Sequence, residues 1–262
     1  MIDVLRTGLR AAPTGTGSIL HSSFRAVNLE FDGRVVTLLN RKGILTASSV
    51  VLDTDQIPSI KGAEFYGNIL HTDSFDALMK NRIDLALHSD GGASIIAIRN
   101  SLQHHIILRE RSIMGAVLLA EGYINKAPEE GFEAAVLEEQ AKRIRTCRSV
   151  EDATRTLLGI GFGLTPSGDD FILGSIAVMQ LTGRSTEGLR PLIAGYTNAF
   201  SRTMLMDGLD GYFPQPLLEV LHAMDSGKNP DEKIFELERI GHTSGFDMVA
   251  GMYYTASNFL HS

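Results

Sequence analysis

The chain of 262 residues contains a single cysteine, so no disulfide can form within it. It has no apolar run near the roughly 20 residues needed to span a bilayer, and its first residues lack the apolar core of a signal peptide. Its formal net charge is −7, and no cluster of Lys and Arg is long enough to form a basic face. These absences predict a protein of the cytoplasm that binds neither nucleic acid nor membrane.

Common short catalytic motifs are missing as well. The sequence has no Walker loop, dinucleotide fingerprint, Gly-x-Ser-x-Gly elbow or Cys/His zinc pattern. The cysteine, Cys147, lies in a basic stretch, where positive charge can lower a thiol pKa, but a helix-end residue without a role is the simpler interpretation. His104 and His105 lack a third ligand, so no metal site is predicted there.

What is present divides the chain into two parts and predicts an α+β fold. Alternating or β-branched apolar residues predict strands at 23–31, 35–39, 49–52, 93–98 and 105–108, with one helix at 74–80. Beyond residue 131 the apolar residues recur at helical spacing. They predict helices at residues 132–145, 149–158, 167–179, 189–205, 216–224, 231–240 and 247–259. We therefore expect a β-rich part over residues 1–120 and an α-helical part over 121–262, joined by a turn-rich segment that contains Pro128.

The most distinctive segment is the glycine-rich stretch of residues 161–170, which leads into an apolar helix. That helix is apolar on nearly every face and is therefore expected to be buried on all sides. Its first N–H groups need partners, so Thr165 or Ser167 is expected to cap it, with Pro166 at the first helical position if Thr165 is the cap. Gly161, Gly163 and Gly168 permit positive φ or close backbone approach. Such a loop can hold an anion against the positive end of the helix.

Two acids in the first turn, Asp169 and Asp170, complicate this interpretation. Carboxylates favour the positive helix end but repel an anion unless a cation lies between them. One alternative is that Asp170 closes a capping box with Ser167 while Asp169 is merely solvated. The other is that Asp169 and Asp170 hold Mg²⁺, the only cofactor the sequence suggests.

A second segment repeats the pattern of the first. Residues 244–251 and 167–174 both read Ser-Gly-x-Asp, three apolar residues and Gly, and both follow an Ile-Gly pair with a Thr just upstream. We infer a helix–loop–helix unit used twice, with both helix N-termini facing one pocket. Gly174 and Gly251 are expected to let the two helices approach closely. His242, in the second loop, is either an anion-binding or proton-transferring group or a loop residue of no consequence.

Over most of its length the sequence resembles the AllH-type family, a bacterial family long catalogued as a domain of unknown function. The resemblance lies in residues 21–24 with 28–29, 163–170, 201–216 around Gly211, and 241–247, where a small or apolar residue is common in place of Phe246. It implies a role beside FdrA-like proteins. In one branch it implies a transferase, the oxamate carbamoyltransferase complex of anaerobic allantoin (purine) breakdown, which makes carbamoyl phosphate and oxamate from oxalurate and phosphate.

The resemblance supplies no catalytic residues, so three functions remain open. The chain is a subunit of a carbamoyl- or acyl-transferring complex with a small-anion cleft, a non-catalytic assembly subunit, or a stand-alone Mg²⁺-dependent phosphate- or nucleotide-binding enzyme. The first interpretation predicts that a small carboxylate or phosphate binds between the two loops. The candidate ligand-binding residues are Gly161, Gly163, Thr165, Ser167, Gly168, Asp169, Asp170, His242, Thr243, Ser244, Gly245 and Asp247.

Overall fold

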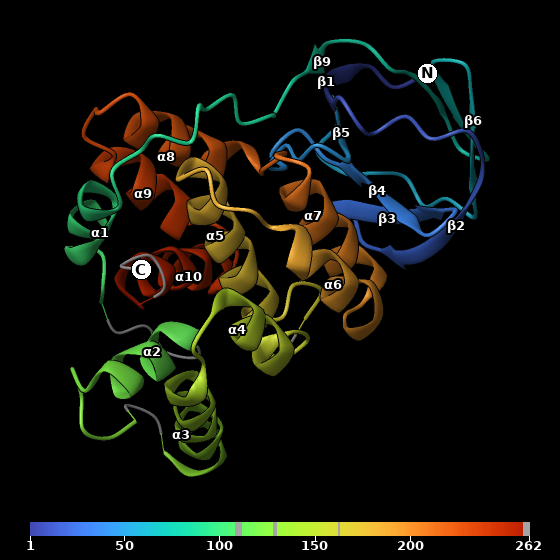
Figure 1. Ribbon diagram of the computed structural model, residues 1–262. Helices are drawn as coiled ribbons and strands as arrows, with labels where there is room; N and C mark the ends of the chain where they lie inside the picture. The colour runs from blue at the N-terminus through green and yellow to red at the C-terminus, as the bar shows by residue number, and fades with distance from the viewer. Residues whose placement is uncertain (108–111, 128–129, 162, 259–262) are drawn as a thin grey trace. The chain divides into compact units, whose positions relative to one another are not determined.

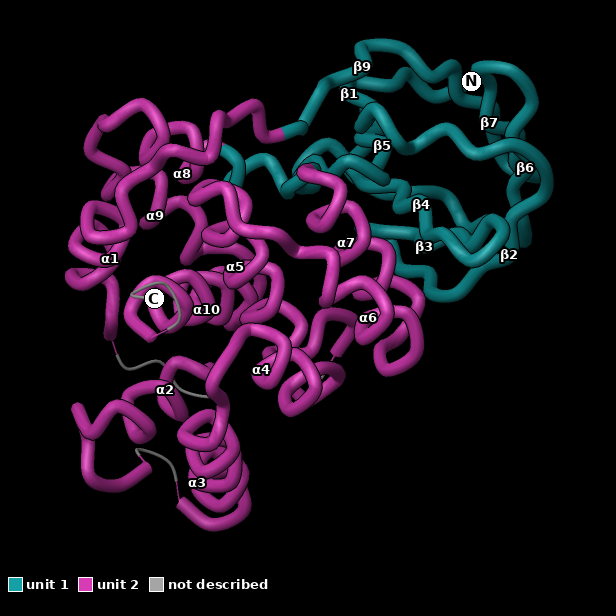
Figure 2. The backbone as a smooth tube through the Cα atoms, in the orientation of Figure 1, with its two compact units in different colours: residues 1–86, 212–218 teal, residues 87–211, 219–262 magenta. Residues whose placement is uncertain are grey.

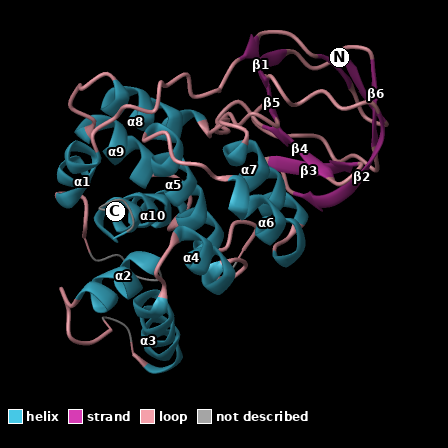
Figure 3. Ribbon diagram, viewed as in Figure 1, coloured by secondary structure: helices cyan, strands magenta, loops and turns pink. Residues whose placement is uncertain are grey.

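The computed structural model describes residues 1–107, 112–127, 130–161 and 163–258. The chain forms two compact units (Figure 2), of which unit 1 comprises Met1–Ala86 and Tyr212–Leu218 and unit 2 comprises Leu87–Gly211 and Glu219–Ser262. Figure 3 shows that the strands belong to the first unit and almost all of the helical residues to the second. The predicted α+β fold is confirmed.

Unit 1 is built on one sheet of nine strands (Figure 1), in the order β8-β7-β6-β2-β3-β4-β5-β1-β9. The strands are β1 (Val4–Gly8), β2 (Gly15–Ser22), β3 (Ala26–Phe31), β4 (Arg34–Leu39), β5 (Ser49–Leu52), β6 (Ala63–Tyr66), β7 (Ile69–Thr72), β8 (Asp76–Leu78) and β9 (Arg82–Ile83). The pairs β4–β5 and β1–β9 are parallel, and the other pairs named in this order are antiparallel.

The core of unit 1 follows from alternation along β3. Val27, Leu29 and Phe31 point to one face, where all three are buried and Phe31 meets the Phe65 ring edge-on at 5.3 Å between centroids. The residue between the first two, Asn28, is also buried, and its Oδ1 accepts a hydrogen bond of 2.9 Å from the Thr37 hydroxyl on β4. The strand is therefore covered on both faces at Asn28, and this buried polar side chain is satisfied.

Unit 2 is helical. Its elements are α1 (Ile95–Gln103), α2 (Ile113–Glu121), α3 (Gly131–Thr146), α4 (Val150–Leu157), α5 (Ser167–Leu181), the short η1 (Glu187–Leu189), α6 (Arg190–Tyr196), α7 (Ala199–Leu209), α9 (Asp231–Glu238) and α10 (Ser244–Asn258). Helix α8 (Gln215–Asp225) begins in the returning segment of unit 1 and continues into unit 2. None of the described helices is long and apolar enough to cross a membrane.

Helices α5 and α10 form the centre of unit 2. Helix α5 packs against α4, α7 and α10, and α10 packs against α1, α2, α5 and α9 (Figure 1). Both helices are buried along most of their length, as the all-round apolar sequence of α5 predicts.

Two glycines let these helices touch. A Cβ on Gly174 would lie 2.0 Å from the Met248 carbonyl oxygen, and one on Gly251 would lie 1.9 Å from that of Phe171. The expected close approach is confirmed. Since Gly174 and Gly251 are equivalent in the repeat, as are Phe171 and Met248, the two contacts are the same contact made twice.

Several predicted elements differ from the structure. Residues 93–98 enter helix α1 rather than a strand, because Ser94 caps the helix and Ile98 and Leu102 lie one turn apart on a buried face. Residues 74–80 hold strand β8, which pairs with β7, not a helix. The predicted helix at 189–205 is broken into α6 and α7, since Asn198 accepts from the Ser201 N–H and starts a new helix.

The change from strand to helix falls between β9, which ends at Ile83, and α1, which begins at Ile95. The strand predicted at 105–108 is wrong for its first residues, because His105 lies in a turn that closes on the Leu102 carbonyl. Leu108 and Pro128, and Phe259 at the end of the last predicted helix, lie outside the described residues. The other helices predicted beyond residue 131 are confirmed, with ends that differ by a few residues.

The close contact between α5 and α10 at Gly174 and Gly251, where the two helices cross, predicts that larger residues there lower stability. Gly174→Ala forces a methyl group against a backbone carbonyl, so we expect the free energy of unfolding to fall by about 1–3 kcal/mol, the usual cost of overpacking. Gly251→Ala should behave alike. The control is Gly195→Ala in α6, where a Cβ meets nothing within 4 Å and alanine should be neutral or stabilising by up to about 1 kcal/mol. Equal urea midpoints for all three variants would contradict the close crossing.

Candidate functional site

The two Ser-Gly-x-Asp loops meet at the N-termini of α5 and α10. The Thr165 and Ser244 hydroxyl oxygens lie 3.1 Å apart and share a hydrogen bond. Ser244 also lies near Asp170 on α5, and Ser167 lies near Asp247 on α10. The serine of each helix thus faces the aspartate of the other. The prediction that these two helix N-termini lie close together is confirmed.

At the start of each helix the glycine N–H donates to the isoleucine carbonyl that precedes the loop, although the loop before α5 is longer than the loop before α10. The Gly168 N–H donates to the Ile160 carbonyl at 2.8 Å, and the Gly245 N–H donates to the Ile240 carbonyl at 3.3 Å. Glycine is required at both positions, since a Cβ would lie 1.9 Å from the carbonyl oxygen of Leu157 or of Leu237, respectively. The repeat seen in the sequence is therefore also a repeat in three dimensions. Two first-turn N–H groups that could have bound an anion are already used within the protein.

The start of α5 differs from the predicted cap. Pro166 occupies the N-cap position rather than the first helical position, and no side chain caps the helix. The predicted capping box between Ser167 and Asp170 is wrong, because neither Asp170 oxygen has a hydrogen-bond partner among the described residues. In the loop before it, Gly161 has φ +129° and Gly163 has φ +90°, conformations that other residues rarely adopt. Phe162, between them, lies outside the described residues.

Asp169 is a structural clamp. Its side chain is fully buried, so the alternative of a solvated first-turn acid is wrong. Its Oδ1 accepts a hydrogen bond of 2.6 Å from the Gly159 N–H, and its Oδ2 accepts one from the Thr197 hydroxyl. Asp169 therefore ties the first turn of α5 to the end of α4 and to the link between α6 and α7. Both of its oxygens are engaged away from the opposing loop.

Asp170 and Asp247 form a buried acid pair. Both side chains are 0% exposed. Neither oxygen of Asp170 has a hydrogen-bond partner in the described protein, and Oδ2 of Asp247 has none either. Three buried carboxylate oxygens without donors would cost several kcal/mol if both groups were charged and nothing else compensated them. Their positions in the repeat are equivalent, so the pair lies where the two halves meet.

Burial is the main cause that raises the pKa of Asp170 well above its usual value, and the charge of Asp247 raises it further. The nearby hydroxyls of Ser244 and Thr165 act in the opposite direction but are outweighed. Burial likewise raises the pKa of Asp247 to about 6, against hydrogen bonds from Ser112 and the Ile113 N–H that lower it. Because the two acids interact, they are expected to titrate as a pair.

A third helix reaches the site, which the sequence analysis missed. Oδ1 of Asp247 accepts hydrogen bonds from the Ser112 hydroxyl at 2.6 Å and from the Ile113 N–H at 2.8 Å. Ser112 is the N-cap of α2, so one carboxylate of the pair holds the beginning of α2. A Ser directly before the apolar run 113–119 is a helix-start signal, and it could have located this helix but not its partner.

Other candidate residues lie nearer the surface than the buried pair of Asp170 and Asp247. Thr165, Ser167, Thr243 and Ser244 are half-buried, and their hydroxyls surround the acid pair. His242 is exposed in the loop between α9 and α10. The structure thus brings the hydroxyls and the two aspartates together and places His242 on the surface.

Two other groups singled out by the sequence belong elsewhere. His105 is buried, and its Nδ1 lies 3.1 Å from Oε1 of Glu238 while its ring meets Phe235 at 4.6 Å. This pair ties the turn after α1 to α9, the helix that leads into the second loop. Cys147 ends α3, and burial raises its thiol pKa, so the lowering expected from its basic neighbours is not found.

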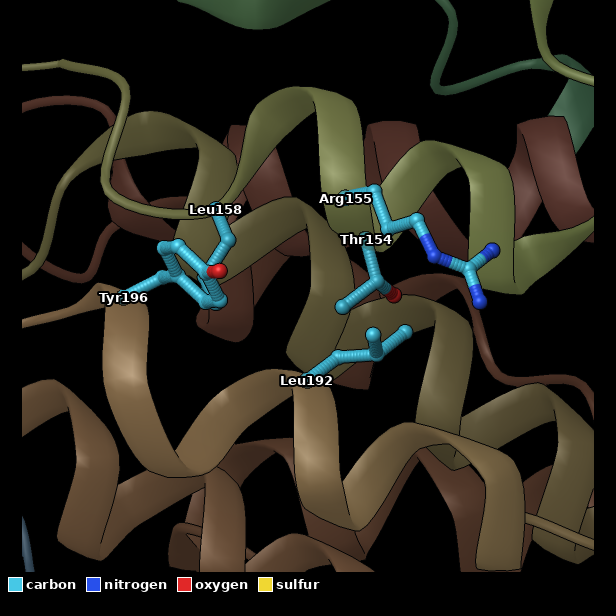
Figure 4. A pocket seen from close by; sticks show the side chains of 5 residues that line it. All are labelled: Thr154, Arg155, Leu158, Leu192 and Tyr196. Atoms are coloured by element: carbon cyan, nitrogen blue, oxygen red, sulfur yellow. The ribbon is translucent and has the colours of Figure 1, made fainter.

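A separate cavity of about 350 Å³ opens between α4 and α6 (Figure 4). Its walls are Thr154, Arg155, Leu158, Leu192 and Tyr196. The Thr154 hydroxyl is bonded to the Val150 carbonyl, which leaves Arg155 and the Tyr196 hydroxyl as the polar groups of a largely apolar wall. No sequence motif marked this cavity. It holds no acid, so it does not share the chemistry of the Asp170–Asp247 pair.

The clamp role of Asp169 predicts a graded loss of stability. Asp169→Ala removes the buried carboxylate that accepts two partly buried hydrogen bonds, so we expect the free energy of unfolding to fall by about 2–4 kcal/mol. Asp169→Asn keeps one acceptor oxygen and should cost clearly less. Urea unfolding of both variants beside the unchanged protein tests this order. If the alanine variant were as stable as the unchanged protein, the clamp would be refuted.

The acid pair predicts a pH dependence. Folding raises the pKa of Asp247 from 3.8 to about 6, so the folded state binds more protons than the unfolded state between these values, and stability falls as pH rises from about 4 to 6. Asp247→Asn can keep the acceptor for Ser112 and Ile113 while removing the charge. In the unchanged protein the titration of Asp247 should lower the free energy of unfolding by on the order of 3 kcal/mol over this pH range, and the variant should lack this decrease.

Urea unfolding of metal-free protein between pH 4 and 7 measures this difference. Glu139→Gln, at an exposed acid of α3 paired with Arg143, is the control and should keep the pH profile of the unchanged protein. An Asp247→Asn profile as steep as that of the unchanged protein would show that the acid is not perturbed.

The segment that carries the site is similar to a known protein family. Residues 157–256 match the model of the family described as oxamate carbamoyltransferase subunit AllH. The matched segment contains both loops, the Asp169 clamp and the Asp170–Asp247 pair, and it runs from the end of α4 into α10. No solved structure matches the chain. Over this helical segment the chain is similar to the AllH family.

Proposed function

We propose that the chain is a subunit of a carbamoyl- or acyl-transferring complex of the oxamate carbamoyltransferase type and contributes a small-anion cleft to it. The observation that carries the proposal is the meeting of the two repeated loops, 3.1 Å apart at Thr165 and Ser244, inside the segment that matches the AllH model. The proposed partners are FdrA-like and other carbamoyltransferase subunits, and the proposed setting is allantoin breakdown in the cytoplasm.

The cleft suits a ligand such as oxamate or phosphate because of what surrounds it. Four hydroxyls, from Thr165, Ser167, Thr243 and Ser244, are half-buried at its rim, and each can donate to a ligand oxygen. The N-termini of α5 and α10 add positive potential without adding bulk. Hydroxyl donors matter here because the Gly168 and Gly245 N–H groups are already bonded within the protein.

The hydrogen bonds of the Gly168 and Gly245 N–H groups within the protein also support a second candidate function. If the loops only cap helices, their donors need no ligand, and the chain is a non-catalytic assembly subunit. The two functions differ in whether the rim hydroxyls affect chemistry. An assay of the isolated chain beside the reconstituted complex separates both from a stand-alone Mg²⁺-dependent enzyme, which would bind and turn over phosphate compounds by itself.

The test is reconstitution of the full chain with its FdrA-like partner and third subunit, followed by measurement of carbamoyl transfer between carbamoyl phosphate and oxamate. We expect activity only in the complex. Thr165→Val combined with Ser244→Ala should raise the apparent oxamate or phosphate constant about a hundredfold, since each of the two lost hydrogen bonds to a charged ligand is worth about 1.5 kcal/mol or more.

Ser226→Ala is the matched control, because that hydroxyl lies at the end of α8 and bonds only to backbone carbonyls of its own helix. It should leave activity and assembly unchanged. A complex that assembles fully but has the same kinetic constants with the double variant would identify the chain as an assembly subunit. Failure of the chain to join any such complex would overturn the proposal.

A further inference from the structure

The buried carboxyl groups of Asp170 and Asp247 lack enough hydrogen-bond donors among the described residues to compensate their burial. Both side chains are fully buried, and three of their four oxygens accept no hydrogen bond from the described protein. The two carboxyl groups interact electrostatically, yet no hydrogen bond joins them directly. These buried oxygens therefore need a partner that the described residues do not supply.

The loop side chains beside the two carboxyl groups carry hydroxyl oxygens, which are hard ligands. The Ser244 and Thr165 hydroxyls lie beside Asp170, and the Thr243 and Ser167 hydroxyls lie beside Asp247. Each aspartate thus has one hydroxyl from its own loop and one from the opposing loop. Carboxylates and hydroxyls without nitrogen or sulfur suit Mg²⁺ or Mn²⁺ rather than a softer metal.

The number of protein ligands also favours Mg²⁺. Among the described residues no three His, Cys, Asp or Glu side chains are grouped to hold a metal, so an all-protein cage of such ligands is not formed. Mg²⁺ is commonly bound by only one or two carboxylates and keeps several waters, which a phosphate or carboxylate ligand can replace. Asp169 does not compete for the ion, because both of its oxygens are engaged by Gly159 and Thr197.

Charge is balanced by such an ion. Each helix N-terminus supplies roughly half a positive charge, so the ends of α5 and α10 compensate only part of two buried carboxylates. A divalent cation reverses the sign of the site and makes it attractive to a small anion. Without it, the anion expected in the cleft would meet the two acids directly.

We propose that Asp170 and Asp247, one from each half of the repeat, together bind a divalent cation, Mg²⁺ in the cell, through which the small anion is held. The anion step rests on the proposed function. The cation site itself rests only on contacts within this chain, so it can be tested without the complex.

The experiment uses the full chain, freed of metal with a chelator and titrated with Mn²⁺ under electron paramagnetic resonance detection. We expect one bound Mn²⁺ per chain, displaced by excess Mg²⁺. Asp170→Asn and Asp247→Asn should each weaken Mn²⁺ binding at least about tenfold, since even changes beside metal ligands commonly cost 10- to 100-fold. Mg²⁺ should raise the melting temperature of the unchanged protein and not of these variants.

Asp231→Asn is the control, an acid in the first turn of α9 that does not belong to the pair. It should bind Mn²⁺ like the unchanged protein. Absence of bound Mn²⁺, or binding that neither Asn variant weakens while both melt cooperatively, overturns the cation site. If Mn²⁺ binds but no complex with the other subunits forms, the cation site stands and the proposed function fails. If oxamate binds equally well without any divalent ion, the anion is not held through the cation, and that part of the proposal is overturned.

Discussion

The close crossing of α5 and α10 is the constraint on which the site depends. Met248 and Phe171 place their carbonyl oxygens against Gly174 and Gly251, so neither helix can shift without a clash. The crossing lies one turn beyond the two aspartates, and it therefore fixes how far apart Asp170 and Asp247 are held. The clamp at Asp169 and the hydrogen bonds from Asp247 to α2 then fix the orientation of the helices that flank the pair.

This arrangement explains why so polar a cluster is tolerated inside a helical core. Asp169 is satisfied by two donors, and Asp247 by two on one side only. Of these three acids, Asp170 has no hydrogen-bond partner on either oxygen among the residues that the structure describes. Buried carboxyl groups are usually paired, so one that is not marks a place where the protein needs something it does not itself supply. The apolar packing of α5 and α10 stabilises the fold enough to keep that unsatisfied group in place.

The sequence predicted what depends on local pattern. The repeat around Ser167 and Ser244, the burial of α5 and the meeting of two helix starts all follow from spacing, because equivalent segments with glycines at equivalent positions pack in equivalent ways. The roles of Asp169 and Asp170 could not be predicted, since neighbouring acids in one turn point in different directions and only tertiary partners such as Thr197 distinguish them. The same holds for Ser112, whose bond to Asp247 spans 135 positions in the sequence. Residues 93–98 were assigned to a strand because a short β-branched run fits a strand as well as a buried helix face.

The exchange of partners across the repeat has a consequence for the integrity of the site. Ser167 faces Asp247, and Ser244 faces Asp170, so each half of the repeat supplies what the other half lacks. A piece of the chain that ends between α7 and α9 contains one complete copy of the motif and yet no site. A substitution in either loop therefore alters the surroundings of the aspartate on the opposing helix as well as those of its own.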